Sequence, residues 1–204
     1  MSDNLIDLCK NYSMISRERF LNNINSVEYI ENNKIEGDIV EIGVWKGGSM
    51  LSMILSTKSN RDFYLYDTFE GMTEPTDLDL DYSNTPAKLI LNDVKCLSTL
   101  DEVKENIYKH TDKRENIHFI KGDILLNKTF PSKIALLRLD TDWYESTKYE
   151  LENFYTLVSD GGVIIIDDYG HWKGCRKAVD EFIKDKNINL IPVDYTGVYF
   201  IKNN

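Results

Sequence analysis

Short apolar runs alternate with amphipathic stretches along most of this chain, and this pattern limits its fold more than any other feature. Short runs rich in Ile, Val, Leu, Phe and Tyr are typical of strands, while apolar residues that recur every three or four positions are typical of helices. Strands that are apolar on both faces and alternate with helices form a parallel sheet covered on both sides. We therefore expect strands at 38–43, 63–67, 117–121, 134–139, 163–167, 188–193 and 198–202.

Two features refine this α/β prediction. The clearest amphipathic helices are expected at 144–158 and 174–184. The last two strands are joined by the short sequence Asp-Tyr-Thr-Gly, which permits an antiparallel hairpin but not a crossover to a parallel strand. The expected fold is thus a Rossmann-like, doubly wound, mostly parallel seven-stranded sheet that ends in an antiparallel hairpin. This is the shape of class I, S-adenosylmethionine-dependent methyltransferases.

Length and charge favour one domain that binds a small molecule. The 204 residues are expected to form a single domain, 1–204, with a helical cap or lid at 1–36 and an insertion or lid at 71–100. A net charge of −10 argues against a nucleic acid or a membrane as the main partner, because an anionic surface would be repelled. We therefore expect a small-molecule or glycan acceptor, and the sequence leaves open whether the chain forms a homo-oligomer.

Cysteine usage and hydropathy predict a soluble, cytoplasmic protein. Cys9, Cys96 and Cys175 are far apart and lack metal-ligand spacing, which argues against a disulfide framework and against a zinc site. The N-terminus carries acids early and has no apolar signal-peptide core. The longest strongly apolar run, 163–166, is too short to span a bilayer.

The segment GDIVEIGVWKGGSM is expected to form a strand, a turn and the start of a helix that together bind a cofactor. Gly43 would let a ligand approach the backbone, and Gly47 and Ser49 would lie at the helix N-terminus, where amides can bind it. Trp45 breaks the dinucleotide fingerprint G-x-G-x-x-G, which argues against NAD. Glu41 is expected to hold a cation such as an amino-acid ammonium group. The alternative is a glycine-rich turn without a ligand.

Two further acids follow the second and third expected strands. Asp67 lies 24 positions after Gly43, where an acid can accept hydrogen bonds from ribose hydroxyls. Asp123 closes the third strand, where adenine would be contacted. The alternative for Asp67 is that it caps a loop.

Three more acids end two consecutive strands in the second half of the chain. Asp140 follows one strand, and Asp167 and Asp168 follow the next, with one helix between them. A right-handed crossover places both strand ends at the same edge of the sheet, so the carboxylates can converge. Such acids repel one another unless a cation lies among them, and oxygen ligands favour Mg²⁺ first, with Mn²⁺ or Ca²⁺ as alternatives. The sequence therefore predicts a metal site formed by Asp140, Asp167 and Asp168.

Asp142 and His171 lie close to these acids in the sequence. Asp142 is placed to start the next helix as an N-cap, with Glu145 three residues later in a capping box. The alternative is that Asp142 contacts the substrate. His171 lies on a loop at the same edge of the sheet, where it could orient a substrate hydroxyl or take its proton.

Several motifs together resemble those of the macrocin O-methyltransferase family, which methylates deoxysugars on macrolide antibiotics. They are EGDIVEIGVWKGGSM, YLYDTFEGM, LLRLDTDWYEST and GGVIIIDDYGHWKGCRKAVDEF, in this order, preceded by YSMISRERF, so that the resemblance covers nearly the whole chain. The chain departs from the family pattern at Thr141, where glycine is usual. The resemblance implies a Mg²⁺-dependent enzyme that moves a methyl group from S-adenosylmethionine to a sugar hydroxyl. It also implies metal ligands at Asp140, Asp167 and Asp168, and cofactor positions at Glu41, Gly43, Asp67 and Asp123.

The reaction requires a group that receives the proton of the acceptor hydroxyl, and the candidates are Asp168, Asp142 and His171. Three alternatives stay open at the level of the sequence. One is a Mg²⁺-dependent phosphatase or phosphotransferase with Asp140 as its nucleophile. Another is methylation of a catechol-like diol, which would chelate a metal equally well. The third is a cofactor-binding partner subunit without catalytic activity.

Overall fold

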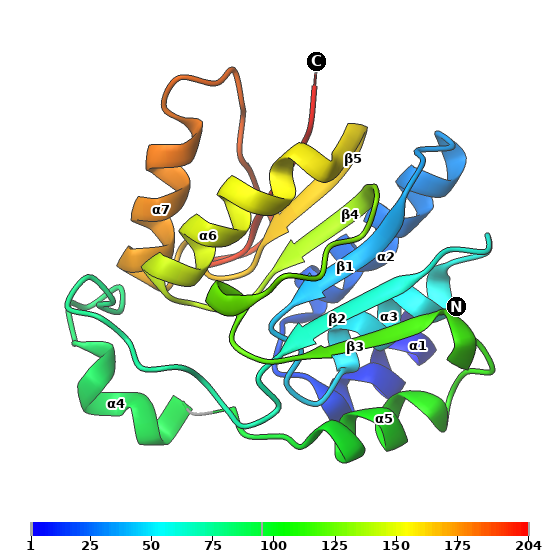
Figure 1. The fold of residues 1–204 in the computed structure, drawn as a ribbon, viewed down its shortest axis with the longest axis horizontal. Coiled ribbons are helices and arrows are strands. Elements are labelled where there is room, and N and C mark those ends of the chain that lie inside the picture. Colours follow the sequence, from blue (N-terminus) through cyan, green and yellow to red (C-terminus); the bar gives the residue numbers. More distant parts are fainter. Residues whose placement is uncertain (1, 95, 204) are drawn as a thin grey trace.

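The computed structural model describes residues 2–94 and 96–203, which form a sheet flanked by helices (Figure 1). The strands are β1 (Asp38–Ile42), β2 (Phe63–Asp67), β3 (Ile117–Lys121), β4 (Ile134–Leu139), β5 (Val158–Ile166), β6 (Ile191–Pro192) and β7 (Val198–Ile201). The α-helices are α1 (Ser2–Cys9), α2 (Arg17–Asn32), α3 (Gly48–Ser56), α4 (Ala87–Val94), α5 (Leu100–Tyr108), α6 (Tyr144–Phe154) and α7 (Lys173–Ile183). The 3₁₀ helices are η1 (Lys10–Tyr12), η2 (Arg114–Asn116), η3 (Ile124–Leu126) and η4 (Tyr155–Leu157).

The sheet has the order β3-β2-β1-β4-β5-β7-β6. The first five strands along the chain pair in parallel, while β7 is antiparallel to both β5 and β6. The predicted fold class, including the antiparallel hairpin at its end, is therefore confirmed. The strand order reverses between β1 and β4, and sheets of this kind bind ligands outside the carboxyl ends of the strands at such a point.

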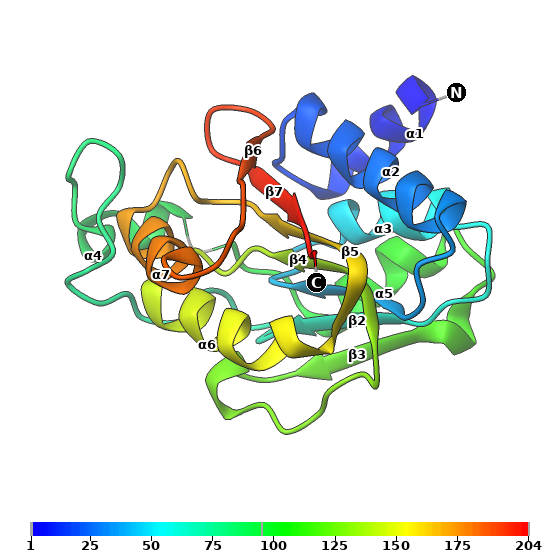
Figure 2. The same ribbon diagram turned by 90° about the horizontal axis from the view of Figure 1, so that it is seen from above.

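Helices cover both faces of the sheet, as the apolar strands require (Figure 2). One apolar core lies between the sheet and helices α1, α2, α3 and α5, and a second lies between the sheet and helices α6 and α7. All six residues of β4 are buried, which explains why this strand is almost continuously apolar. Within residues 2–94 and 96–203, no helix combines the length and the apolar character that crossing a membrane requires.

The N-terminal segment is helical, as expected, but it belongs to the body of the fold. Phe20, Val27 and Ile30 of α2 are buried in the first core, together with Ile6 and Cys9 of α1. Helix α2 also packs on α3 and contacts strands β4 and β5. Most of the segment expected as a cap or lid is thus a layer over the sheet, and of its described residues only 13–15 and Arg19 line the ligand cavity described below.

Two strands differ from the sequence prediction by more than one residue. Strand β5 begins at Val158 rather than at 163. Its first part contains two glycines, which are not typical of strands, but their backbone groups still form hydrogen bonds with Lys202, which directly follows the neighbouring strand β7. The N–H of Gly161, for example, donates to the carbonyl of Lys202 at 2.8 Å. Strand β6 is shorter than expected and consists of Ile191 and Pro192, which pair with Tyr199 and Val198 of β7.

The segment between β2 and α5, expected as an insertion or lid, is anchored by one carboxylate. Asp79 is fully buried, and its Oδ1 accepts a hydrogen bond of 2.8 Å from the backbone N–H of Tyr144, the first residue of α6. Its Oδ2 accepts from the N–H and the hydroxyl of Thr76 at 2.7 and 2.8 Å. Beyond this anchor, α4 extends away from the sheet (Figure 1).

The substitution Asp79→Ala should lower the free energy of unfolding by about 1–3 kcal/mol, because it leaves buried donors without a partner. It should also expose the segment around α4 to limited proteolysis. Urea unfolding measures the first effect. The control is Asp77→Ala, which removes an exposed ion pair with Lys88 and should change stability by no more than about 1 kcal/mol. Equal stability of the two variants would contradict the anchoring role of Asp79.

Candidate active site

A cavity of about 850 Å³ opens at the carboxyl ends of strands β1 to β5. This volume falls within the range of roughly 300–1,000 Å³ that is usual for small-molecule sites. The rim is formed by residues 13–15, 71–74, 96–97 and 195–196, which are far apart in the sequence. Of the predicted site residues, the cavity is lined by Gly43, Ser49, Asp67, Asp123, Asp140, Asp142, Asp167, Asp168 and His171.

The glycines of the first motif are required by packing within the protein. Gly43 has a φ of +86°, and a Cβ atom there would lie 1.9 Å from the carbonyl oxygen of Asp140. Gly47 has a φ of +89° and faces the side chains of Val103 and Ile107, away from the cavity. Ser49 does line the cavity, and its hydroxyl accepts a hydrogen bond of 3.0 Å from Asn23. The backbone just after β4 thus approaches Gly43 closely, and because Gly43 also lines the cavity, the approach of a ligand there stays a prediction.

Asp67 and Asp123 line the cavity and also hold the backbone around it. The Oδ2 atom of Asp67 accepts from the N–H groups of Val44 and Trp45 at 2.7 and 3.0 Å, and its Oδ1 accepts from Phe69 at 2.7 Å. Asp123 accepts from the N–H of Leu125 at 2.9 Å. The loop-capping alternative for Asp67 is thus present in the structure, beside its contact with the cavity.

Glu41 occupies a different place from the one expected. It is fully buried and is not among the described residues that line the cavity. Its Oε1 atom accepts a hydrogen bond of 2.9 Å from Nη1 of Arg138, its neighbour across the β1–β4 register. Burial raises the pKa of Glu41 to about 7. Its Oε2 atom is buried and has no hydrogen-bond partner among the described residues. In this structure Glu41 therefore pairs with an arginine through one oxygen and does not line the cavity, and its expected role as a cofactor ligand stays a prediction.

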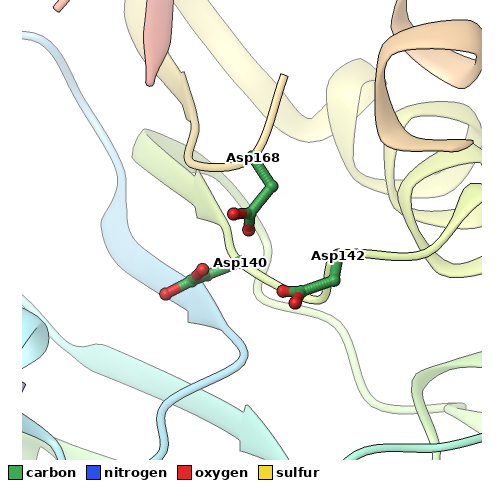
Figure 3. A group of neighbouring side chains, drawn as sticks. All are labelled: Asp140, Asp142 and Asp168. Atoms are coloured by element: carbon green, nitrogen blue, oxygen red, sulfur yellow. The ribbon is translucent and has the colours of Figure 1, made fainter. Parts of the chain in front are cut away.

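Three carboxylates converge in the cavity: those of Asp140, Asp142 and Asp168 (Figure 3). One oxygen of each lies within 4.8 Å of the other two. The structure does not bring Asp167 into this group, although the sequence analysis did. Asp167 also lines the cavity, but its carboxylate is engaged by other side chains. Its two oxygens are ion-paired with Arg138 and Arg19.

Asp142 joins the group because it does not cap the following helix, and the predicted capping box is wrong. Helix α6 begins at Tyr144, with Trp143 at the N-cap position, and Asp79 accepts the hydrogen bond from its first N–H. Asp142 has a φ of +69°, in the left-handed region, and its Oδ2 accepts a hydrogen bond of 2.9 Å from Nε1 of Trp172.

The group is poorly compensated by cationic side chains. Burial, followed by the charge of Asp140, raises the pKa of Asp142 to about 7. Burial and the charge of Asp142 raise the pKa of Asp168 well above its ordinary value. The Oδ2 atom of Asp168 is buried and has no hydrogen-bond partner within the described ranges. A divalent cation or an added proton is needed to make this arrangement favourable.

His171 lines the cavity at one edge of the carboxylate group. Its ring packs against Trp172, with 4.8 Å between ring centroids, and against Tyr82, with 5.5 Å. Burial lowers the pKa of His171, which favours the neutral imidazole at neutral pH. A neutral imidazole can accept a proton, so the structure keeps His171 as a candidate for that role.

Several residues that shape the site were missed by the sequence analysis. The clearest is Arg138, whose side chain is fully buried and donates to Glu41 and Asp140. An arginine inside the apolar run IALLRLD was a visible signal, since a buried guanidinium requires acidic partners. Asp79 and Trp172 gave no comparable local signal, because their partners are far away in the sequence.

A family model described as Macrocin-O-methyltransferase (TylF) matches residues 8–202. The chain belongs to this family. The family resemblance drawn from the motifs is thereby confirmed, and so is the prediction of an O-methyltransferase. The match spans every strand of the sheet and every acid of the carboxylate group.

Similar proteins agree with this membership. Demethyldecarbamoylnovobiocin O-methyltransferase of Streptomyces niveus is 35% identical over 93% of this chain and 75% of its own length. The 8-demethyl-8-(2,3-dimethoxy-alpha-L-rhamnosyl)-tetracenomycin-C 4'-O-methyltransferase of Streptomyces olivaceus is 31% identical over 93% of this chain and 75% of its own length. The solved structure of the O-methyltransferase NovP has a TM-score of 0.83 and 31% identity, covering 95% of this chain and 83% of that one.

The substitution Gly43→Ala should destabilise this family member much more than Gly122→Ala does. Both glycines have positive φ, at +86° and +143°, but an added Cβ at Gly122 has nothing within 4 Å, whereas one at Gly43 meets Asp140. The clash should add about 1–3 kcal/mol to the cost of the unfavourable backbone conformation. Urea unfolding of both variants measures the difference. Similar stability would show that strand β4 does not require glycine at this position.

Proposed function

We propose that this O-methyltransferase transfers the methyl group of S-adenosylmethionine to a hydroxyl of a sugar or sugar-containing acceptor, with Mg²⁺ or a similar divalent cation at the carboxylate group. The observation that carries the proposal is the convergence of Asp140, Asp142 and Asp168 inside the large cavity of a member of this family. The relative from Streptomyces olivaceus supports a sugar acceptor, because its name specifies a rhamnosyl group.

The donor half of the cavity fits a nucleoside. Asp67 and Asp123, at the ends of β2 and β3, can accept hydrogen bonds from ribose hydroxyls or an amine, and Ile124 and Leu125 give this end an apolar wall. We assign the donor to this half and the acceptor to the half that contains Asp140, Asp142 and Asp168. When bound, S-adenosylmethionine supplies the methyl group as an electrophile.

The carboxylate group fits a hard divalent cation. Its donors are all oxygen atoms, and the buried, unpartnered Oδ2 of Asp168 lacks the cationic or hydrogen-bonding partner that such an atom requires. Asp140 and Asp168 would hold the ion. When bound, the ion would lower the pKa of an acceptor hydroxyl, as metals do for water. Asp167, expected as a third ligand, has both oxygens ion-paired with arginines in this structure.

The protein's own side chains would orient the acceptor and take its proton. Asp142 is the best-placed proton acceptor, because Trp172 fixes its carboxylate in the cavity while burial raises its pKa toward neutrality. His171 is the second candidate. The cavity walls would hold donor and acceptor in line, and such alignment can remove as much as about 7–11 kcal/mol from a barrier in favourable cases.

The purified protein should bind S-adenosylhomocysteine in calorimetry and should transfer a labelled methyl group to an acceptor that bears a rhamnosyl group. Treatment with EDTA should abolish the transfer, and added Mg²⁺ should restore it. The acceptor panel should include a catechol, which would be preferred if the acceptor is an aromatic diol. Failure to bind S-adenosylhomocysteine would overturn the proposed donor, and full activity in EDTA would overturn the metal requirement.

The substitution Asp142→Asn should lower kcat by about 10²–10⁴-fold, the usual contribution of a general base, because an amide cannot take the proton. Affinity for S-adenosylhomocysteine should be unchanged, since Asp142 belongs to the acceptor half. His171→Asn is the matched comparison and should cost much less. If His171→Asn carries the larger loss instead, the histidine is the proton acceptor.

A further inference from the structure

A single guanidinium links three adjacent strands directly below the carboxylate group. Nη1 of Arg138, on β4, donates to Oε1 of Glu41 on β1 at 2.9 Å and to Oδ2 of Asp140 at 2.7 Å. Nη2 of Arg138 donates to Oδ1 of Asp167, at the end of β5. Arg138 and Asp140 can meet because residues two apart in a strand point to the same side.

Stability alone does not explain this buried network. Replacing a buried ion network by well-packed apolar residues is often neutral or even stabilising, because removing several charges from water is costly. The side chains of Arg138, Glu41 and Asp167 are at most 4% exposed, so each of them bears this cost. Asp140 differs, since its side chain is 25% exposed and it belongs to the group of three carboxylates. Asp167 also lines the cavity, but both of its oxygens are ion-paired with arginines. The network therefore acts on the carboxylate group through Asp140.

The network is held from outside as well. Arg19, at the start of α2, is ion-paired with Oδ2 of Asp167, and its Nε donates to Asp194 at 3.0 Å. Asp194 also accepts a hydrogen bond of 2.6 Å from the hydroxyl of Ser16. Asp167 is thus held between two arginines. It in turn holds Nη2 of Arg138, while Nη1 of the same guanidinium donates to Asp140.

We propose that Arg138 is a positioning residue that orients Asp140 for the divalent cation, and that Glu41 acts on the metal site through Arg138 and does not contact the methionine part of the donor. The inference rests on the proposed function, because it presupposes the metal site. It assigns Glu41 to the acceptor half of the reaction, whereas its place in the first motif had suggested the donor half.

The first test is Arg138→Lys, which keeps the positive charge but loses the planar fork that reaches three carboxylates. Binding of Mn²⁺ alone, followed by the electron paramagnetic resonance signal of the free ion, should weaken by about 10- to 100-fold, as when groups that orient metal ligands are removed. Affinity for S-adenosylhomocysteine without metal, measured by calorimetry, should be unchanged.

The second test uses Glu41→Gln, which keeps the shape of the side chain and an oxygen that can accept from Arg138. Mn²⁺ binding should weaken by about tenfold or more, with S-adenosylhomocysteine binding unchanged. The matched control is Asp123→Asn in the donor half, for which the opposite pattern is expected. Circular dichroism and thermal melting confirm that each variant is folded, and Glu41→Gln remains informative if Arg138→Lys does not fold.

Two outcomes would overturn the inference while leaving the proposed function intact. One is wild-type affinity for Mn²⁺ in the folded Arg138→Lys or Glu41→Gln variant. The other is a Glu41→Gln variant that loses affinity for S-adenosylhomocysteine but not for Mn²⁺, as a direct contact with the donor would require. A wild-type protein that binds S-adenosylhomocysteine but no Mn²⁺ would overturn the metal site itself, and this inference with it.

Discussion

The guanidinium of Arg138 ties together the strands that carry the acids of the site. It lies between β1 and β5, the neighbours of its own strand, and it pairs with one carboxylate from each of these strands and with Asp140. Because Asp167 is engaged by Arg138 and Arg19, the adjacent acids Asp167 and Asp168 have different environments. Both line the cavity, but Asp167 belongs to a buried ion network, while Asp168 has a buried oxygen without a partner among the described residues. Two adjacent aspartates thus differ in the partners that their carboxylates have.

The fold could be predicted from sequence because the signals that define it are local. Strands β2, β3 and β4 have the predicted bounds, since each is a short apolar run bordered by polar residues or turns. The convergence of Asp140 and Asp168 followed from topology alone, because parallel strands present their carboxyl ends at one edge. The same argument could not tell whether Asp167 or Asp168 joins the carboxylate group. Topology places both residues at the end of β5 but does not give the direction of either side chain.

The predictions that differ from the structure concern contacts between distant residues. Asp142 carries a good local signal for a helix N-cap, but Asp79, which lies 65 residues before Tyr144, accepts the hydrogen bond from the N–H of Tyr144, the first of α6. Glu41 carries the local signature of a cofactor ligand, but Arg138, 97 residues later, takes its carboxylate. In both cases the contact joins residues that are far apart in the sequence, so a local pattern could not pair them, even where the buried Arg138 signalled that it needs acidic partners. Local patterns predicted which residues gather at the site more successfully than they predicted what each residue contacts.

The anchor at Asp79 restricts how the acceptor side of the cavity can change during evolution or engineering. The segment that carries Asp79 also forms part of the cavity rim, through Met72, Thr73 and Glu74. Exchanging the whole segment for that of a relative would therefore leave α6 uncapped unless the new segment supplies an equivalent carboxylate. Acceptor specificity is better altered at single rim positions, with residues 76–79 retained.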